Sequence, residues 1–299
     1  MCRTLVIIVT YNGMKWLERC LDSVVNSSIP LDAYIVDNGS TDGSQQFITA
    51  NYPQFTFYQS PTNSGFGAAN NIGLKYAVEH NYDYVYLLNQ DAWVEADTIE
   101  VLIKHQKKSP EYGILSPLQT NAEMNMLDKN FAAACAKNRE IFSDYVLGQK
   151  NKTLYDVNFV MAAHWLISRE CLLKVGVFSP VFYHYGEDDN YIHRAKYHNF
   201  RIGVATDALG VHDREYRETS KEKAIYMIVL PFLIISSNIN YPLFLSIVKA
   251  YIKTIYSAII QSYKYRDIFI LLKYIFRIYP IYNIYRDRKR NMISNTKIV

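Results

Sequence analysis

Two side chains that could bind a metal ion stand two residues apart at the end of an apolar run. The stretch VYLLNQDAWV, residues 85–94, begins as a buried strand and then places Asn89 and Asp91 on either side of Gln90. Because side chains alternate along an extended chain, we expect Asn89 and Asp91 on one side and Gln90 pointing away. Such a pair can hold Mg²⁺ or Mn²⁺ together with waters and substrate phosphates. A helix cap at Asp91 is the alternative, although the next helix is expected only from Ala96.

A second polar group follows two strands that should be neighbours. DNGSTDGS, residues 37–44, could by itself be a turn with a helix cap at Asp42 or Ser44. VTYNG, residues 9–13, ends the preceding strand and should lie beside it. Together the two stretches predict one polar pocket.

The stretch NSGFGAANNIG, residues 63–73, has two glycines in the spacing of a dinucleotide-binding loop, Gly65 and Gly67. The third glycine of that fingerprint is replaced by Asn70, and the stretch follows the third strand rather than the first. A dinucleotide site is therefore a weak interpretation. The alternative is a tight loop that approaches a ligand and leads into a helix whose N-terminus can receive phosphate.

A run of acids stands in GEDD, residues 186–189. A carboxylate within hydrogen-bond reach of a substrate hydroxyl can take its proton as a new bond forms. Repulsion among Glu187, Asp188 and Asp189 favours a raised pKa for one of them. The other interpretation is structural, because acids also favour the N-terminus of a helix, here over residues 190–198.

The elements that must position these residues alternate between strands and helices. Period-two apolar runs predict strands and period-3.6 runs predict helices. The expected strands are Leu5–Thr10, Ala33–Val36, Thr56–Tyr58, Tyr84–Leu88 and Arg201–Ala205. The expected helices are Lys15–Val25, Ser44–Asn51, Gly67–Glu79, Ala96–Lys107 and Arg169–Val175. This order predicts an α/β fold with a mostly parallel central sheet, helices on both faces, and a ligand site beyond the carboxyl ends of the strands.

Composition sets further limits on the chain. Its 299 residues suffice for one large α/β domain with an appendage or for two small domains. The four cysteines have neither CxxC pairing nor a disulfide framework spacing, which favours a reduced compartment and argues against zinc. The apolar run near the N-terminus is too short for a signal peptide and is expected to be the first strand. No stretch reaches the roughly 18 uninterrupted apolar residues of a membrane-spanning helix.

The C-terminal region differs in charge from the rest of the chain. Residues 249–299 hold 11 Lys or Arg and 2 Asp or Glu, a net charge of +9, which leaves −5 for residues 1–248. We expect a catalytic domain over residues 1–223 and a basic helical region over residues 224–299. Amphipathic segments at 249–264 and 267–279, followed by YRDRKRN, suit a membrane interface. A helical cap with a solvated basic face is the alternative.

The motifs VTYNG, DNGSTDGS, NSGFGAANNIG, LLNQDAWV and GEDD, in this order and spacing, resemble the family 2 glycosyltransferases with the GT-A fold, particularly the rhamnosyltransferase-like bacterial branch. The resemblance covers about residues 4–215. It implies an α/β GT-A catalytic domain, with a mostly parallel central sheet, helices on both faces and amphipathic helices added at the C-terminus.

The resemblance also implies roles for single residues. Asn89-Gln90-Asp91 corresponds to the Asp-x-Asp motif of the family and departs from it by having Asn at the first position. Asp91 is then the implied metal ligand. His212, in GVHD, resembles a histidine that some GT-A enzymes place on the metal or the diphosphate. Asp188 is the implied base, with Glu187 beside it. The expected nucleotide-sugar-binding residues are Thr10, Tyr11, Asn12, Asp37, Asn38, Gly65, Phe66, Asn70 and Asn89.

The expected activity is inverting transfer of a sugar from a nucleotide diphosphate donor to a hydroxyl of a surface glycan, with Mg²⁺ or Mn²⁺ as cofactor. We expect Asp91 and Asp188 to face one pyrophosphate from its two sides. Aromatic stacking on the sugar could come from Trp165, Tyr183 and Tyr185, and phosphate binding from Arg214 and Arg217, although core or solvated positions explain these residues equally well.

The same resemblance suggests dTDP-rhamnose as donor and a lipid-linked glycan as acceptor. The expected location is cytoplasmic, peripheral on the inner face of the cell membrane, and no nucleic acid is expected as a partner. The alternative function is a catalytically silent nucleotide-sugar-binding subunit that docks other glycan-assembly proteins at the membrane.

Overall fold

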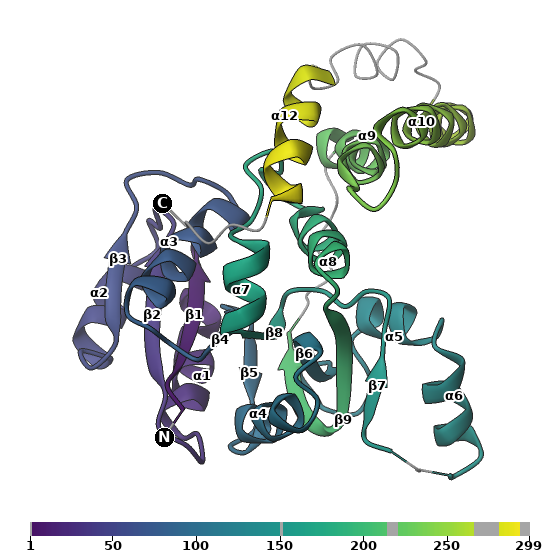
Figure 1. The fold of residues 1–299 in the computed structure, drawn as a ribbon. Coiled ribbons are helices and arrows are strands. Elements are labelled where there is room, and N and C mark those ends of the chain that lie inside the picture. Colours follow the sequence, from purple (N-terminus) through teal and green to yellow (C-terminus); the bar gives the residue numbers. More distant parts are fainter. Residues whose placement is uncertain (1, 150–151, 214–220, 266–280, 294–299) are drawn as a thin grey trace.

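The structure of the protein is a computed structural model that describes residues 2–149, 152–213, 221–265 and 281–293 (Figure 1). Its N-terminal half alternates strands and helices: β1 (Thr4–Thr10), α1 (Met14–Val25), β2 (Asp32–Asp37), α2 (Ser44–Asn51), β3 (Thr56–Gln59), α3 (Phe66–Glu79), β4 (Tyr84–Asn89), β5 (Ala92–Val94) and α4 (Thr98–Lys108). The middle of the chain holds β6 (Tyr112–Thr120), α5 (Lys129–Cys135), α6 (Arg139–Val146), β7 (Leu154–Asp156), β8 (His164–Ser168), α7 (Arg169–Val175), α8 (Glu187–Tyr197) and β9 (Arg201–His212). Within the described residues after β9, the helices are α9 (Lys221–Ser237), α10 (Leu243–Tyr265) and α12 (Ile281–Met292).

One mixed sheet forms the centre of the molecule, in the strand order β3-β2-β1-β4-β8-β6-β9-β5, with β7 also paired to β9. Of the described strands, β1, β2, β3, β4, β6 and β9 run in one direction, whereas β5, β7 and β8 run in the other. The sheet is therefore mostly parallel, as expected.

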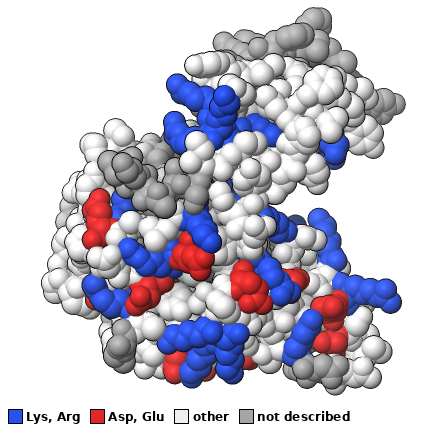
Figure 2. Space-filling view, viewed as in Figure 1, with Lys and Arg blue, Asp and Glu red and all other residues white. Residues whose placement is uncertain are grey.

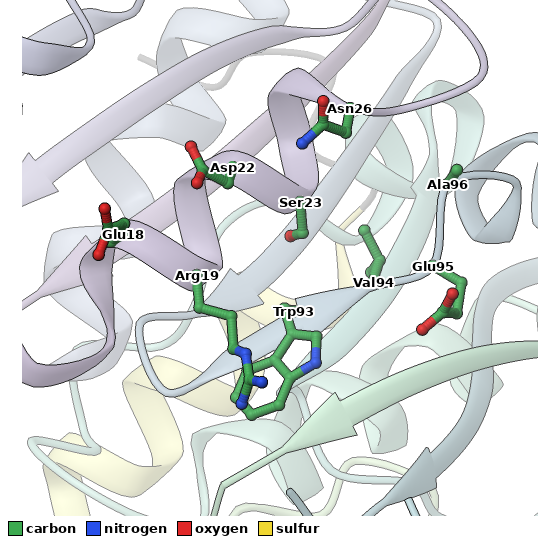
Figure 3. A pocket seen from close by; sticks show the side chains of 9 residues that line it. All are labelled: Glu18, Arg19, Asp22, Ser23, Asn26, Trp93, Val94, Glu95 and Ala96. Carbon is green, nitrogen blue, oxygen red and sulfur yellow. The ribbon is translucent and has the colours of Figure 1, made fainter.

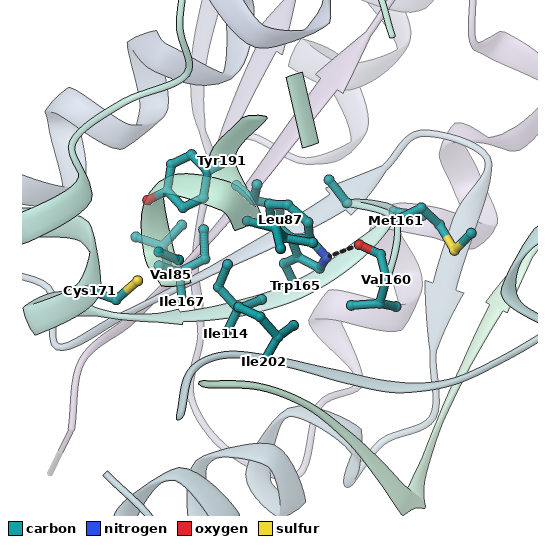
Figure 4. Close-up of a cluster of buried hydrophobic side chains, with 14 of the residues drawn as sticks. Val85, Leu87, Ile114, Val160, Met161, Trp165, Ile167, Cys171, Tyr191 and Ile202 are labelled. Atoms are coloured by element: carbon teal, nitrogen blue, oxygen red, sulfur yellow. Dashed lines mark hydrogen bonds between the residues drawn. The ribbon is translucent and has the colours of Figure 1, made fainter. Parts of the chain in front are cut away.

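Helices cover both faces of this sheet because its strands are apolar on both sides. Leu5 and Ile7 of β1 belong to a core cluster with residues of α3, α7 and α8, whereas Val6 and Ile8 belong to a second cluster with α1, α2 and α4. The first cluster is centred on Trp165 of β8, whose indole Nε1 donates to the carbonyl of Val160 at 3.2 Å (Figure 4). Strands of a parallel sheet are buried on both faces, and for this reason they appear in the sequence as continuous apolar runs.

The first four predicted strands and the helices among them agree with the structure to within two residues at each end. The strand expected at Arg201–Ala205 is longer than expected, since β9 continues to His212. The short strand β5 and the elements between residues 112 and 156 were not predicted. Their pairing partners lie far away in sequence, as for β5, whose Ala92 pairs with His212.

The described C-terminal helices pack on the part of the molecule that contains the sheet. α9 contributes Leu230 and Phe232 to a third apolar cluster, which also contains Phe182 from the segment before α8 and Ile284 from α12. Asn190 Nδ2 donates to Ser237 Oγ at 3.2 Å, which joins α8 to the end of α9. These contacts agree with the helical cap, which the sequence analysis gave as the alternative to a membrane interface.

Not all cations of the YRDRKRN stretch are available to a surface, because Arg288 is buried. Its guanidinium donates to the carbonyls of Ser236, at 2.9 Å, and of Asn238 and Tyr241. Those carbonyls end α9 or follow it, so Arg288 satisfies acceptors that a helix end leaves open. The neighbouring Asp287 is buried too and accepts from Ser179 Oγ at 2.9 Å. Residues 267–279 lie outside the described part.

Candidate active site

The loops that follow the strands of one direction surround a cavity of about 580 Å³, here called the strand-end cavity. Its lining comes from the ends of β1, β2, β4 and β9, from the loop between β3 and α3 with the start of α3, and from the segment before α8: Val9, Tyr11, Asn38, Asn63, Gly65, Phe66, Asn89, Gln90, Asp91, Tyr183, His184, Tyr185 and His212. The cavity thus lies where a doubly wound sheet binds its ligands.

A second cavity, of about 450 Å³, is bounded by helices and is here called the helix-side cavity. Its lining is Phe66, Asn89, Asn130, Ala133, Ala134, Lys137, Phe159, Met161, Ala162, Ala163, His184, Tyr185, Gly186, Glu187, Asp188, Asp189, Met227 and Leu230. Asp91 and Asp188 therefore line two cavities, not the single one that the sequence analysis expected. The two adjoin, because Phe66, Asn89, His184 and Tyr185 belong to both.

Gln90 links the end of β4 to the end of β1, which corrects the expectation that it points away. Its Oε1 accepts from Thr10 Oγ1 at 2.8 Å and from the amide of Tyr11 at 2.7 Å. There is space for this contact because residue 13 is glycine: a Cβ at Gly13 would lie 2.3 Å from Gln90 Oε1. The sequence offered one signal for this role, the position of Gln90 directly beyond a central strand.

The acid that ends β2 organises its own loop from beneath. Asp37 is fully buried, and its Oδ2 accepts from the amides of Gly39 and Ser40 and from Gln45 Nε2. Asn12 ties the first loop to the second, because its Oδ1 accepts from the amide of Thr41 at 2.8 Å. Asp37 and Asn12 are not among the residues that line the cavity.

The glycine-rich stretch forms a tight loop at the cavity wall, as in the second interpretation of its sequence. Asn38 holds the loop in place, with Oδ1 accepting from the amide of Ser64 at 2.9 Å and Nδ2 donating to Asn63 Oδ1 at 3.0 Å. Gly65 has φ of +87°, and a Cβ there would lie 2.1 Å from the carbonyl oxygen of Tyr183. Only glycine fits a backbone of this conformation so close to another chain segment.

Asp91 and His212 meet because β5 pairs with β9. Asp91 Oδ1 lies 3.4 Å from His212 Nε2, and the His212 side chain is 2% exposed. Asn89 Oδ1 is buried and has no hydrogen-bond partner within the described residues. Within those residues no group of three or more His, Cys, Asp or Glu could hold a metal ion. The protein therefore offers one carboxylate, one imidazole and one amide oxygen at this point of the cavity.

A buried histidine supports the strand that carries His212. His164 accepts at Nδ1 from the hydroxyl of Tyr86 at 2.8 Å and donates from Nε2 to the carbonyl of Val211 at 3.0 Å. The direction of the second bond follows because a carbonyl can only accept. Burial lowers the pKa of His164 to about 3, so its ring is neutral. Its ring fills the space that a Cβ at Gly210 would need.

The three acids of GEDD stand in the first turn of α8 and line the helix-side cavity. Burial, and then the neighbouring Asp188, raise the pKa of Glu187 to about 8 and that of Asp189 to about 7. Glu187 is 6% exposed, and its Oε2 has no partner among the described residues. The acids therefore begin a helix, as in the structural interpretation, and they also face a cavity, while the role of one of them as a base stays a prediction.

Of the predicted nucleotide-sugar residues, five line the strand-end cavity: Tyr11, Asn38, Gly65, Phe66 and Asn89. The other four, Thr10, Asn12, Asp37 and Asn70, are not in its lining and bind neighbouring loop or helix atoms. Among the possible stacking residues, Tyr183 and Tyr185 line the cavity, whereas Trp165 is fully buried in the core. Arg214 and Arg217 lie outside the described residues.

Sequence reasoning missed His184, Met227 and Leu230 as residues of the site. His184 stands beside GEDD in FYHYGEDD, so its place in the chain was a usable signal. Met227 and Leu230 belong to α9, and nothing in an apolar helix indicates which cavity it will line.

A further hollow of about 530 Å³ lies between α1 and β5, where the Arg19 guanidinium stacks 4.4 Å above the Trp93 ring (Figure 3). It shares no residue with either cavity.

Two solved structures share this fold. The chain superposes on Staphylococcus aureus TarS 1-349 in complex with UDP with a TM-score of 0.57 and 17% identity, covering 82% of this chain and 68% of that one. It superposes on GalNAc-T7 with UDP, GalNAc and Mn²⁺ with the same TM-score and 14% identity, covering 81% and 52%. The expected GT-A fold is therefore confirmed.

Two relatives are glycosyltransferases by name. The low-salt glycan biosynthesis hexosyltransferase Agl10 of Haloferax volcanii is 24% identical over 76% of this chain and 72% of its own length. The N-acetylglucosaminyl-diphospho-decaprenol L-rhamnosyltransferase of Mycobacterium tuberculosis is 30% identical over 38% of this chain and 40% of its own. The family model described as glycosyl transferase family 2 matches residues 5–176, which is more than half of the chain. The chain is therefore a member of glycosyl transferase family 2.

Proposed function

We propose that the protein transfers a sugar from a nucleotide diphosphate donor to an acceptor hydroxyl in one displacement that inverts the anomeric carbon. The donor occupies the strand-end cavity and the acceptor enters the helix-side cavity. The observation that carries the proposal is the contact between the two cavities at Phe66, Asn89, His184 and Tyr185, with Asp91 on one side and Asp188 on the other.

The donor side has groups that suit the phosphates and the nucleobase of a nucleotide sugar. The amide groups that begin α3 and the tight loop at Gly65 suit the approach of a phosphate. Tyr11 is 45% exposed at the cavity and could lie against the nucleotide base. Thr10, Asn12, Asp37 and Asn70 act on the donor through the loops that they hold.

The donor set at the end of β4 fits a hard divalent cation. Asp91, His212 and the unpartnered amide oxygen of Asn89 supply oxygen and imidazole ligands, and diphosphate oxygens and water would complete the coordination of Mg²⁺ or Mn²⁺. When bound, such an ion stabilises the charge of a departing diphosphate. The GalNAc-T7 structure, which shares the fold, contains Mn²⁺.

On the acceptor side, Asp188 takes the proton of the attacking hydroxyl. The hydroxyl oxygen forms its bond to the anomeric carbon from one face while the bond to the diphosphate oxygen breaks on the other, and the electron pair leaves with the diphosphate. Burial favours the protonated form of Glu187, so its neutral carboxyl can donate a hydrogen bond toward the acceptor while Asp188 remains the base.

The relatives suggest the chemical class of the substrates. One relative is named for glycan biosynthesis and another for a rhamnosyl transfer to a diphospho-decaprenol acceptor. We therefore keep dTDP-rhamnose as the first donor to try and a lipid-linked surface glycan as the acceptor class, at the inner face of the cell membrane. No described helix is long and apolar enough to cross a bilayer.

The test is release of nucleoside diphosphate from a panel of nucleotide sugars, with and without Mn²⁺. We expect one donor to be turned over by the wild type, and Asp188→Asn to bind that donor without releasing diphosphate. A wild type that binds a donor and never releases diphosphate, with any acceptor fraction added, would favour the silent binding subunit instead.

A further inference from the structure

Helix α10 has its burial pattern reversed compared with a water-facing helix. Among the α10 residues whose side chains the structure describes, the buried ones are small, Ser246, Ala250 and Thr254, and pack toward α9. Its large apolar residues are exposed instead, with Phe244 at 74%, Ile252 at 63% and Ile259 at 62%. The same outward face includes Leu245, Val248, Ile255 and Tyr256. A contiguous apolar face of this kind marks a binding surface rather than a surface evolved for water.

The charges of α10 have one sign. The segment from Leu243 to Tyr265 contains three lysines and no Asp or Glu. Lys249 Nζ lies 4.7 Å from the centre of the Tyr241 ring, and Lys253 Nζ lies 5.9 Å from that of Tyr256, so exposed cations stand beside exposed aromatic rings. Lysine and tyrosine flanking an apolar face fit the boundary between anionic headgroups and acyl chains.

The helix next to α10 lines the helix-side cavity and contacts a residue that both cavities share. Met227 and Leu230 of α9 line the helix-side cavity, and the Tyr226 hydroxyl donates to the carbonyl of His184 at 2.8 Å. His184 is one of the four residues shared by the two cavities. In the space-filling view a notch opens between the C-terminal helices and the body of the molecule (Figure 2). α9 therefore connects the exposed face of α10 to the acceptor side of the site.

We propose that the outward face of α10 docks on an anionic lipid bilayer and holds the helix-side cavity at the membrane surface, where a lipid-linked acceptor is presented. This inference rests on the proposed function for the acceptor, but the docking itself does not require catalysis. It assigns the membrane contact to the apolar face of α10; in the basic stretch of α12, Arg288 is buried and Arg286, Lys289 and Arg290 are exposed.

The first test is flotation of the full chain with vesicles of phosphatidylcholine alone or with phosphatidylglycerol added. We expect binding to the anionic vesicles, and a loss of at least tenfold in the double variant Ile252→Glu/Ile259→Glu. The matched control is Phe142→Glu/Val146→Glu on α6, where the two side chains are equally exposed, at 62% and 65%. The proposal is overturned if the wild type does not bind anionic vesicles or if only the α6 variant loses binding to them.

A second test reports on the face itself. Cys20, Cys135 and Cys171 are buried, so a Cys2→Ser background allows selective labelling of Ile252→Cys with an environment-sensitive dye. We expect a blue shift on anionic vesicles, and none for Phe142→Cys. Light scattering without vesicles identifies the competing occupant: a dimer that Ile252→Glu dissociates would assign the face to a second copy of this chain and overturn the proposal.

The result is separable from the proposed function. Flotation and dye shift are measured without donor, so failure of sugar transfer leaves them unaffected. Conversely, diphosphate release in detergent does not depend on a bilayer.

Discussion

The two sides of the site are built differently. The strand-end cavity, which we propose as the donor side, is lined mostly by loops that follow the parallel strands β1 to β4, and also by Tyr183, His184, Tyr185 and His212. The acceptor side is assembled from α5, the loop before β8, the N-terminus of α8 and α9, which span about a hundred residues of sequence. The strand-end cavity is therefore built mostly from repeated local units, whereas the helix-side cavity depends on packing between elements that lie far apart in sequence.

This difference also separates two kinds of chemistry. The strand-end cavity has backbone amides, side-chain amides and one carboxylate in its wall. The helix-side cavity instead has three carboxyl groups in the first turn of α8. Substitutions on the donor side should weaken binding of the nucleotide sugar, and substitutions on the acceptor side should slow transfer. The predictions below test this division, from the largest effect to the smallest.

Asp188→Asn should lower the turnover number by about 10²- to 10⁴-fold, because the acceptor hydroxyl loses its base. Donor affinity, measured by calorimetry, should stay within about twofold of the wild type. Asp189→Asn is the matched control and should have a much smaller effect. Equal losses in both variants would argue against a single base in this turn.

Asp91→Ala should weaken donor binding by about 10- to 100-fold in the presence of Mn²⁺, since the protein loses its carboxylate ligand. Titration with and without chelator measures this loss, and the chelated wild type should behave like the variant. If the wild type kept full donor affinity and activity in chelator, the cation would have no part in the reaction.

Arg288→Met should destabilise the protein by about 3 kcal/mol, because buried carbonyls at the end of α9 lose a charged donor. Thermal unfolding measures the effect. Lys289→Met, at an exposed neighbouring position, should change stability by less than about 0.5 kcal/mol. An equally small effect at Arg288 would mean that the C-terminal helices do not unfold with the catalytic part.

Gly65→Ala should cost about 2 kcal/mol and also lower donor affinity, because a Cβ meets the Tyr183 carbonyl in the wall of the strand-end cavity. Gly43→Ala provides the comparison. Gly43 has a similar φ of +90° but nothing within 4 Å of its Cβ position, so only the backbone strain remains. Similar donor affinities in the two variants would exclude a role for the close approach at Gly65.

The raised pKa of Glu187 predicts a modest pH dependence of stability. The folded state holds this proton more tightly than the unfolded state, so the stability is present at about pH 4 and is lost as pH rises toward about 8. Glu187→Gln should flatten the decline in melting temperature between pH 5 and pH 8. An unchanged slope would place the titrating group elsewhere.

The sequence by itself determined the repetitive half of the molecule. Apolar periods of two and 3.6 are local properties, so they fixed the four parallel strands, their helices and the edge where Asn89, Asp91 and Asn38 gather. The motif GEDD likewise marked a group of acids that line the helix-side cavity. Element boundaries failed chiefly where a partner strand decides, as in the extension of β9 to His212.

Only the tertiary structure decided how the distant pieces meet. Asp91 lies beside His212 because β5 pairs with β9, across 121 positions of sequence. Likewise, the amphipathic pattern of α10 gave no indication that its small residues are the buried ones, or that α9 reaches His184. Periodicity identifies faces, but which face finds a partner depends on packing between elements, and that information is not local in the chain.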